Sequence, residues 1–119
     1  MINLHNRVFV TKSNSKNGEV DENTYYHYRQ VGEVITAEYH GGSIRQGFIL
    51  GKVEGEGLVL VYQHLNRELE FRTGKCSSTP EQLPGGRLRL HQQWQWTNGD
   101  LSKGESVVEE VGSFEKEKH

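Results

Sequence analysis

The sequence has no capacity for an internal disulfide, because it holds a single cysteine, Cys76. A lone cysteine is typical of a reducing compartment, so we expect a cytoplasmic protein. Residues 1–7 lack the basic start and apolar core of a signal peptide, and no apolar run approaches the ~18 residues of a membrane helix. The 14 basic and 16 acidic side chains nearly balance, which disfavours nucleic acids and membrane surfaces as partners.

Hydrophobic residues are also scarce, at 33% of the chain with a mean hydropathy of −0.77. Disorder is nevertheless excluded, because aromatic and β-branched residues alternate with polar ones along most of the length. A period of two indicates strands with one buried and one solvent-facing side. We expect one domain over residues 1–112, followed by a flexible charged tail over residues 113–119.

Turn signals divide the chain into eight β-rich runs. These are residues 7–11, 24–31, 34–40, 44–53, 58–64, 69–78, 86–96 and 105–111. The sixth run is expected to stop before Pro80, because proline has no backbone N–H to donate to a neighbouring strand. Gly47 and Gly51, inside the fourth run, are interpreted as bends or bulges. The short connections predict an all-β, eight-stranded antiparallel up-and-down (meander) barrel, with a two-sheet sandwich as the alternative.

The run over residues 86–96 has the most regular alternation. Both tryptophans of the chain, Trp94 and Trp96, fall on its apolar side, so this strand should form a main wall of the core. The turn Asn98-Gly99 follows at once, which puts Trp96 near a barrel mouth and Trp94 ~7 Å deeper at ~3.3 Å per residue.

Three stretches carry a resemblance to a small bacterial family with a prokaryotic avidin-like domain. They are Gly74-Lys75-Cys76 with Ser78-Thr79-Pro80-Glu81, Gly86-Arg87-Leu88-Arg89-Leu90-His91, and Trp94-Gln95-Trp96 with Gly99-Asp100. The resemblance covers nearly the whole chain and implies an avidin-like barrel. True avidins bind biotin between aromatic walls, which Trp94 and Trp96 resemble in kind. The first strand lacks the Gly-x-Trp start of avidin and lipocalin relatives, so no individual avidin contact is carried over.

Relatives of this kind are sometimes labelled N-acetylglutamate synthase, and the residues argue against that activity. Its acetyl-CoA loop resembles Arg/Gln-x-x-Gly-x-Gly/Ala, to which Arg29–Val34 comes nearest. Val34 stands where a small residue must admit the phosphate, and the segment lies between strands rather than before a helix. No nucleophile–base pair can be identified either, so we predict a non-enzyme without a cofactor or metal site.

Aromatic and polar side chains on the expected inner faces make up the candidate ligand site. These are Tyr26, Tyr28, Tyr39, Tyr62, His64, Phe71, Gln92, Trp94, Trp96 and Glu109. Glu109 is included because one glutamate of the last strand must face inward. Two hypotheses stay open: a small apolar or aromatic ligand binds in the barrel mouth, or the core is filled and the protein is a structural or protein-interaction module. An aromatic-lined void above ~300 Å³ would favour binding.

The fourth and fifth runs are apolar on both faces. One face fills the barrel, and the other would leave a contiguous apolar patch in water, which usually marks association. We therefore predict a homodimer or higher homo-oligomer through outward residues of these strands, such as Ile49, Val59 and Val61.

Overall fold

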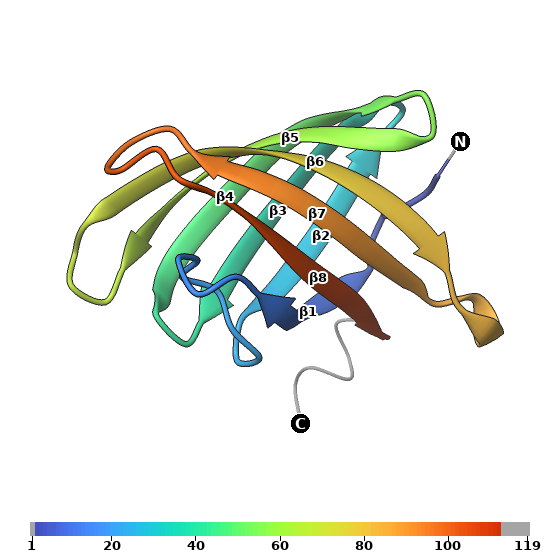
Figure 1. Cartoon of the computed structure of the whole chain (residues 1–119). Helices are drawn as coiled ribbons and strands as arrows, with labels where there is room; N and C mark the ends of the chain where they lie inside the picture. The colour runs from blue at the N-terminus through green and yellow to red at the C-terminus, as the bar shows by residue number, and fades with distance from the viewer. Residues whose placement is uncertain (1, 113–119) are drawn as a thin grey trace.

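The computed structural model describes residues 2–112, and eight antiparallel strands close into a barrel in sequence order (Figure 1). The strands are β1 (Val8–Asn14), β2 (Tyr25–Val31), β3 (Val34–Gly41), β4 (Ile44–Glu54), β5 (Gly57–Asn66), β6 (Phe71–Gln82), β7 (Leu88–Trp96) and β8 (Lys103–Gly112). A single 3-10 turn, η1 (Pro84–Gly86), joins β6 to β7. The predicted eight-stranded meander barrel is confirmed. The expected tail, residues 113–119, lies outside the described residues.

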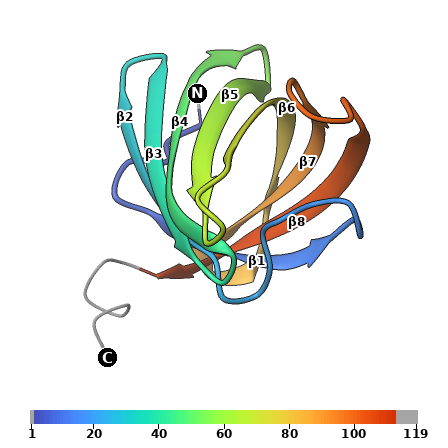
Figure 2. The ribbon, with the colours of Figure 1, turned by 90° about the vertical axis from the view of Figure 1, so that its left-hand side faces the viewer.

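The two ends of the barrel are built differently. The long β1–β2 connection, residues 15–24, crosses one end, which we call the mouth, and Figure 2 views the barrel from this side. At the opposite end the segment before β1 folds inward. Leu4 is fully buried there, and its amide donates to the Gln30 side chain over 2.8 Å. A cavity that admits a ligand can therefore open at the mouth but not at the far end.

Glycines inside the strands make room for aromatic rings on neighbouring strands. A Cβ added to Gly47 would overlap the ring of Tyr39, and one added to Gly74 would overlap the ring of Tyr62. Gly47 and Gly51 lie within continuous pairing, and the irregularity of β4 falls earlier, between Ile44 and Gln46. Neither glycine is therefore a bulge: Gly47 accommodates the Tyr39 ring, and Gly51 accommodates the Leu60 side chain and the β5 backbone.

Strand β6 is longer than expected, because it continues through Pro80 to Gln82. Pro80 pairs with Leu90 of β7, whereas pairing with β5 ends at Ser78. Beyond Ser78 one side of β6 has no neighbouring strand, so a proline, which has no backbone N–H to donate, can be accommodated there.

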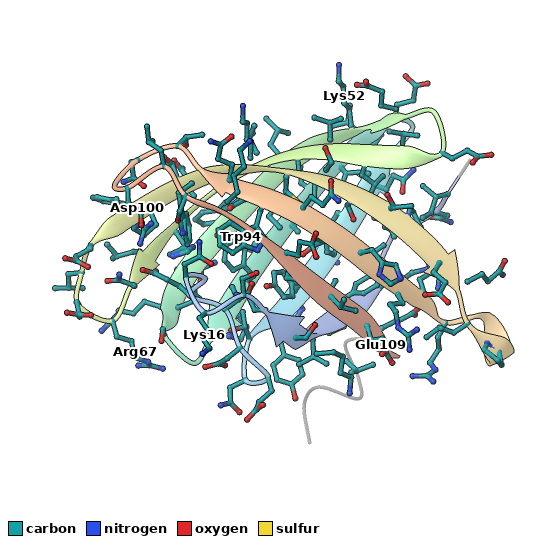
Figure 3. The ribbon with its side chains drawn as sticks, viewed as in Figure 1. Lys16, Lys52, Arg67, Trp94, Asp100 and Glu109 are labelled. Atoms are coloured by element: carbon teal, nitrogen blue, oxygen red, sulfur yellow. The ribbon has the colours of Figure 1, made fainter. Side chains whose placement is uncertain are left out.

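The outer surface of the barrel carries most of the charge. Lys16, Lys52 and Arg67 project away from the ribbon (Figure 3). An apolar strip interrupts this surface on β4 and β5, where Phe48, Leu50, Val59 and Val61 are 38–56% exposed. Ile49 was expected in this strip, but it is 7% exposed and faces the interior. Within residues 2–112, no helix is long and apolar enough to cross a membrane.

Candidate functional site: the barrel mouth

A cavity of about 50 Å³ lies in the lumen beneath the mouth. Its lining combines seven of the predicted site residues with others that sequence reasoning did not select. The predicted ones are Tyr26, Tyr39, Tyr62, His64, Gln92, Trp94 and Trp96, and the others are Asn14, Gly18, Glu19, Val20, Ile49, Leu60, Cys76 and Ser106. The volume has room for a few water molecules, since one water needs ~10–15 Å³. It is well below the ~300 Å³ of a typical ligand pocket.

Aromatic rings in contact with one another form the cavity walls. Trp94 and Trp96 lie 5.3 Å apart between ring centroids, and Tyr62 meets Trp96 edge-on at 5.9 Å. On the opposite wall, Tyr26 and Tyr39 stack at 5.3 Å. Burial raises the pKa of the Tyr39 and Tyr62 hydroxyls, so both stay protonated and can donate hydrogen bonds.

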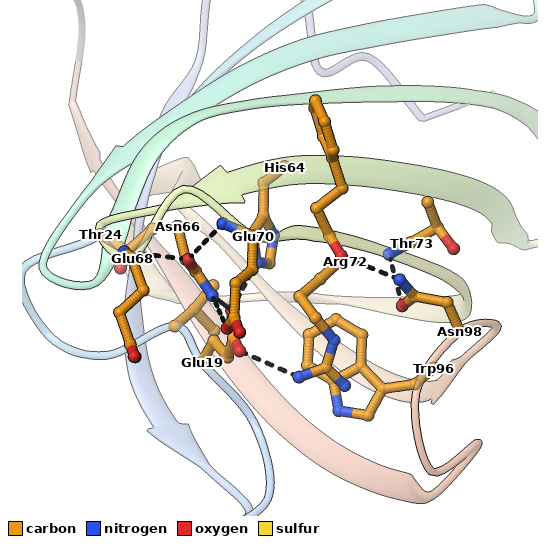
Figure 4. Close-up of polar contacts among 12 residues, drawn as sticks. Glu19, Thr24, His64, Asn66, Glu68, Glu70, Arg72, Thr73, Trp96 and Asn98 are labelled. Carbon is orange, nitrogen blue, oxygen red and sulfur yellow. Dashed lines mark hydrogen bonds and ion pairs between the residues drawn. The ribbon is translucent and has the colours of Figure 1, made fainter.

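Glu19 of the β1–β2 connection closes the mouth with its carboxylate (Figure 4). One oxygen lies 2.8 Å from Nε2 of His64 and 3.4 Å from Nδ2 of Asn66, and the other lies 2.9 Å from Nη1 of Arg72. Burial acts to raise the pKa of Glu19, but the His64 contact, helped by Asn66 and Arg72, outweighs it, and the pKa is lowered. Glu19 is therefore an ionised cap on the cavity at neutral pH.

His64 is the polar link between the cap and the aromatic wall. Burial lowers the pKa of His64, with the adjacent Arg72 acting in the same direction against the raising effect of Glu19. A neutral ring donates from only one nitrogen. Because Glu19 can only accept, Nε2–H faces Glu19, and Nδ1, 2.7 Å from the Tyr39 hydroxyl, accepts the hydrogen bond from it.

Arg72 lies against the Trp96 ring at the mouth. Its guanidinium carbon lies 3.9 Å from the centroid of the Trp96 ring, which is a cation–π distance. Its Nη1 contacts Glu19, while its buried Nε has no hydrogen-bond partner among residues 2–112. Arg72 thus keeps an unused donor at the mouth.

The indole nitrogens of both tryptophans anchor the β1–β2 connection. Trp96 donates to the carbonyl of Asn17 over 3.0 Å, and Trp94 donates to the side chain of Asn14 over 3.1 Å. Asn14 in turn donates to the carbonyl of Val20 over 3.0 Å. Val20 is the residue of the connection that packs against the hydrophobic core, so a single apolar side chain and a set of polar contacts hold the connection over the lumen.

A second cluster of polar side chains lies deeper in the lumen. The Ser106 hydroxyl donates to Gln92 over 3.0 Å, and Thr11 and Tyr26 share a hydrogen bond of 3.1 Å. Tyr28, although predicted as a site residue, lies in the closed core and does not line the cavity. The lumen therefore offers polar partners below the rings as well as at the mouth.

Phe71 does not belong to the site, since it is 73% exposed on the outer face of β6. The inward positions of this strand are the small residues Gly74, Cys76 and Ser78. The rings of Tyr62, Trp94 and Trp96 fill the space in front of them. Neighbouring strands supply the large side chains in this part of the lumen. The small residues of β6 therefore face inward, and the alternate set, which includes Phe71, faces outward.

Glu109 is also outside the site, because Glu110 is the glutamate that faces inward. Glu110 is 9% exposed and lies far from the mouth, where it accepts from Arg7 over 2.6 Å and from the Leu88 amide over 3.1 Å. Glu109 pairs with Arg89 on the outer surface instead. Arg7 is distant in the sequence, so no local pattern distinguishes the two glutamates.

The sequence did not indicate that Glu19, Asn66 and Arg72 belong to the site. Glu19 lies in a loop whose composition gives no sign of its position. Arg72 lies next to Phe71, and because Phe71 was expected to face inward, Arg72 was expected to face outward.

Within the described range no group of three or more His, Cys, Asp or Glu residues could hold a metal ion. Cys76 lines the cavity as a free thiol, and burial raises its pKa to about 12.

Comparison with known proteins agrees with this architecture. A family model described as "Avidin-like protein" matches residues 2–111. The crystal structure of apo shwanavidin (P1 form) superposes with a TM-score of 0.62 at 12% identity, covering 90% of this chain and 95% of that one. At this identity the likeness is one of fold. No curated protein sequence matches the chain.

Proposed function

This chain belongs to the avidin-like family, and from that premise we propose that it binds a small apolar or aromatic molecule in the mouth of its barrel. One observation carries the proposal. The lumen beneath the mouth is walled by aromatic rings yet is covered by a connection that polar contacts hold in place. Such walls with a few polar groups are the usual make-up of a small-molecule site.

Binding requires the cover to move. The cavity of about 50 Å³ is too small for an aromatic molecule while Glu19, Gly18 and Val20 remain in its lining. Displacing the connection removes these residues from the mouth and leaves Trp96, Tyr62 and Tyr39 as the walls of a deeper opening. A ligand therefore exchanges the polar contacts of the connection for stacking on the rings.

The alternative is a non-catalytic interaction module with a filled core, and the small cavity volume favours it. Fluorescence and thermal-shift titrations with indole-free neutral aromatics such as benzamide, and with biotin, separate the two. We expect a change in tryptophan emission and a raised melting temperature with at least one probe. Cys76→Met, which fills the cavity, should abolish the response, and Lys75→Met, on the outside of the same strand, should keep it. A folded parent protein without any response leaves the interaction module as the function.

We also propose that the barrel forms a homo-oligomer through the apolar strip of Phe48, Leu50, Val59 and Val61. Leu50 pairs directly with Val61, so the strip is continuous across two strands. A shallow hollow of about 600 Å³ on the outside of β5–β8 begins at Val59 and gives a second copy further surface to contact.

We also propose a cytoplasmic location, which the single free cysteine supports.

A further inference from the structure

We propose that the β1–β2 connection is an acid-sensitive cover, which lies closed over the mouth at neutral pH and is released when His64 takes up a proton. This inference rests on the proposed function, because it assigns a means of regulation to the same site. The sensor is the His64 imidazole, and the latch is the Glu19 carboxylate that the imidazole contacts.

Glu19 is the polar link between the connection and one side of the mouth (Figure 4). Among residues 2–112, the hydrogen bonds and ion pairs from the connection to β5 and β6 all involve its carboxylate. It contacts His64 over 2.8 Å, Asn66 over 3.4 Å and Arg72 over 2.9 Å. Weakening these contacts therefore frees the connection from this whole side of the mouth.

The other end of the connection is anchored to the opposite side of the mouth. The Ser15 amide donates to the Glu105 carbonyl of β8 over 2.9 Å, and the Asn17 side chain donates to the Lys103 carbonyl over 2.9 Å. Neither contact involves an ionised side chain. The connection is thus attached at one side by backbone carbonyls and at the other by a carboxylate, so only the second attachment answers to charge at the mouth.

The closed mouth has no good place for a second proton on His64. Nε2–H already faces Glu19, so the proton has to go to Nδ1, 2.7 Å from the Tyr39 hydroxyl that donates to it. The hydroxyl would have to turn its hydrogen away, and within residues 2–112 it has no other hydrogen-bond partner. The new charge would also lie beside Arg72, on a side chain that is 1% exposed.

Opening the connection relieves these costs. Burial lowers the pKa of His64 below its ordinary value of 6.5, and Arg72 acts in the same direction, although Glu19 opposes them. Opening admits water to the imidazole and so removes the main cause of the lowered pKa. The open form therefore binds a proton at pH values at which the closed form does not, and acidification shifts the equilibrium toward the open form.

Titratable and charged groups surround the imidazole on several elements. They are Glu19 of the connection, Tyr39 of β3, Tyr62 of β5, Glu70, which contacts Asn66, and Arg72 and Cys76 of β6. The pKa of Glu19 is lowered from 4.5, so the latch itself stays ionised between pH 7.5 and 5.5. Burial raises the pKa of both tyrosines, and that of Cys76 to about 12, so these groups stay neutral.

The test measures how fast methyl methanethiosulfonate modifies Cys76, which lines the cavity beneath the connection. The rate is followed by mass spectrometry at pH 7.5, 6.5 and 5.5 and divided by the rate for the urea-unfolded protein at the same pH. This ratio should rise as the pH falls, by up to about tenfold, which is the limit for one proton taken up through a pKa of 6.5. Exchange of the Tyr28 amide, bonded to the Arg7 carbonyl at the closed end, should show that the barrel stays folded.

Two variants identify the sensor. His64→Gln keeps an N–H for Glu19 but cannot take up the proton, so its ratio should not depend on pH. His91→Gln is the matched control, because His91 also contacts a glutamate, Glu81 over 2.7 Å, but on the outer surface, and it should respond as the parent does. A parent ratio that does not change with pH, or an equal rise in His64→Gln, overturns the acid-sensitive cover.

A measurement on the parent alone covers the case in which His64→Gln does not fold. The His64 ring is titrated by NMR, and its midpoint should coincide with that of the rise in Cys76 modification; separate midpoints overturn the proposal. Benzamide titration at pH 7.5 tests the proposed function separately. A barrel that binds benzamide with a Cys76 ratio independent of pH keeps its function and lacks the switch, whereas a ratio that depends on pH without any ligand response supports the switch and counts against the function.

Discussion

The Tyr39 hydroxyl lies 2.7 Å from Nδ1 of His64, although a whole strand separates the strands that carry them. The residue between them on β4 is Gly47, which pairs with Tyr39 on one side and His64 on the other. Without a side chain at position 47, the Tyr39 ring crosses β4 and meets the imidazole edge-on at 5.6 Å. This contact fixes the imidazole that faces Glu19.

His64 should make the protein lose stability on mild acidification. Burial lowers its folded-state pKa below the ordinary value of 6.5. Below pH 6.5 the unfolded chain therefore binds a proton that the folded chain does not, and stability falls as the pH drops toward the folded-state pKa. Urea unfolding at pH 7.5, 6.5 and 5.5 should show a smaller loss for His64→Gln than for the parent. Parallel losses in the two proteins would contradict the prediction.

The fold could be predicted from the sequence because turn residues and alternation are local signals. The strand order followed from short connections, and the position of Trp96 near the mouth followed from Asn98-Gly99. Which face of a strand points inward depends on neighbours that are distant in the sequence. Rings on β5 and β7 determine which residues of β6 face inward. On β8, Arg7 determines that Glu110 rather than Glu109 does so. Ile49 shares its face with Gly47 and Gly51, and this face can be identified as the inner one once such glycines are understood as positions that face large side chains of a neighbouring strand.

Glu110 should contribute far more to stability than its neighbour Glu109. Glu110→Gln keeps the shape but removes the charge that accepts from Arg7 and from the Leu88 amide, and we expect a loss of about 1.5–3 kcal/mol. Glu109→Gln breaks a more exposed pair with Arg89 and should cost at most ~1 kcal/mol. Chemical denaturation of both variants measures the difference. Equal losses would mean that the inward direction of Glu110 has no energetic consequence.

Gly74 should tolerate no side chain as long as Tyr62 is present. A Cβ at position 74 overlaps the Tyr62 ring, so Gly74→Ala should cost ~1–3 kcal/mol through overpacking. Tyr62→Leu shortens the opposing side chain. In the double variant the cost of Gly74→Ala should largely disappear, which a double-mutant cycle on unfolding free energies detects. Additive losses would show that glycine is needed at position 74 for another reason.

The apolar strip on β4 and β5 should hold copies of the chain together. Leu50→Lys with Val61→Lys places two charges at its centre without touching the lumen, because both side chains face outward. We expect a folded monomer from this variant and an oligomer from the parent by light scattering, since a stable interface buries ~1,000 Å² or more. Ser13→Lys with His91→Lys, at exposed positions on β1 and β7 outside the strip and the hollow, is the control. A parent protein that is monomeric at ~100 µM would refute the interface, because an interface of ~1,000 Å² or more should hold at that concentration.

Trp96 should control the movement of the β1–β2 connection more directly than Trp94 does. Although nearer the mouth, Trp96 is only 3% exposed against 8% for Trp94, because Arg72 lies on its ring and the connection is bonded to its indole. Trp96→Phe keeps most of the ring but removes the donor to Asn17, at a cost of about 0.5–1.5 kcal/mol.

The consequence can be measured at one amide. Gly18 N–H donates to the Ser15 carbonyl over 3.0 Å within the connection, and its hydrogen exchange reports opening of the cover. Exchange at Gly18 should accelerate in Trp96→Phe. In Trp94→Phe it should change less, because Asn14 still donates to the Val20 carbonyl when the indole is lost. The Tyr28 amide, which donates to the Arg7 carbonyl at the closed end, should exchange as in the parent in both variants and serves as the internal reference. Equal rates at Gly18 in Trp96→Phe and the parent would mean that the indole bond to Asn17 does not hold the cover closed.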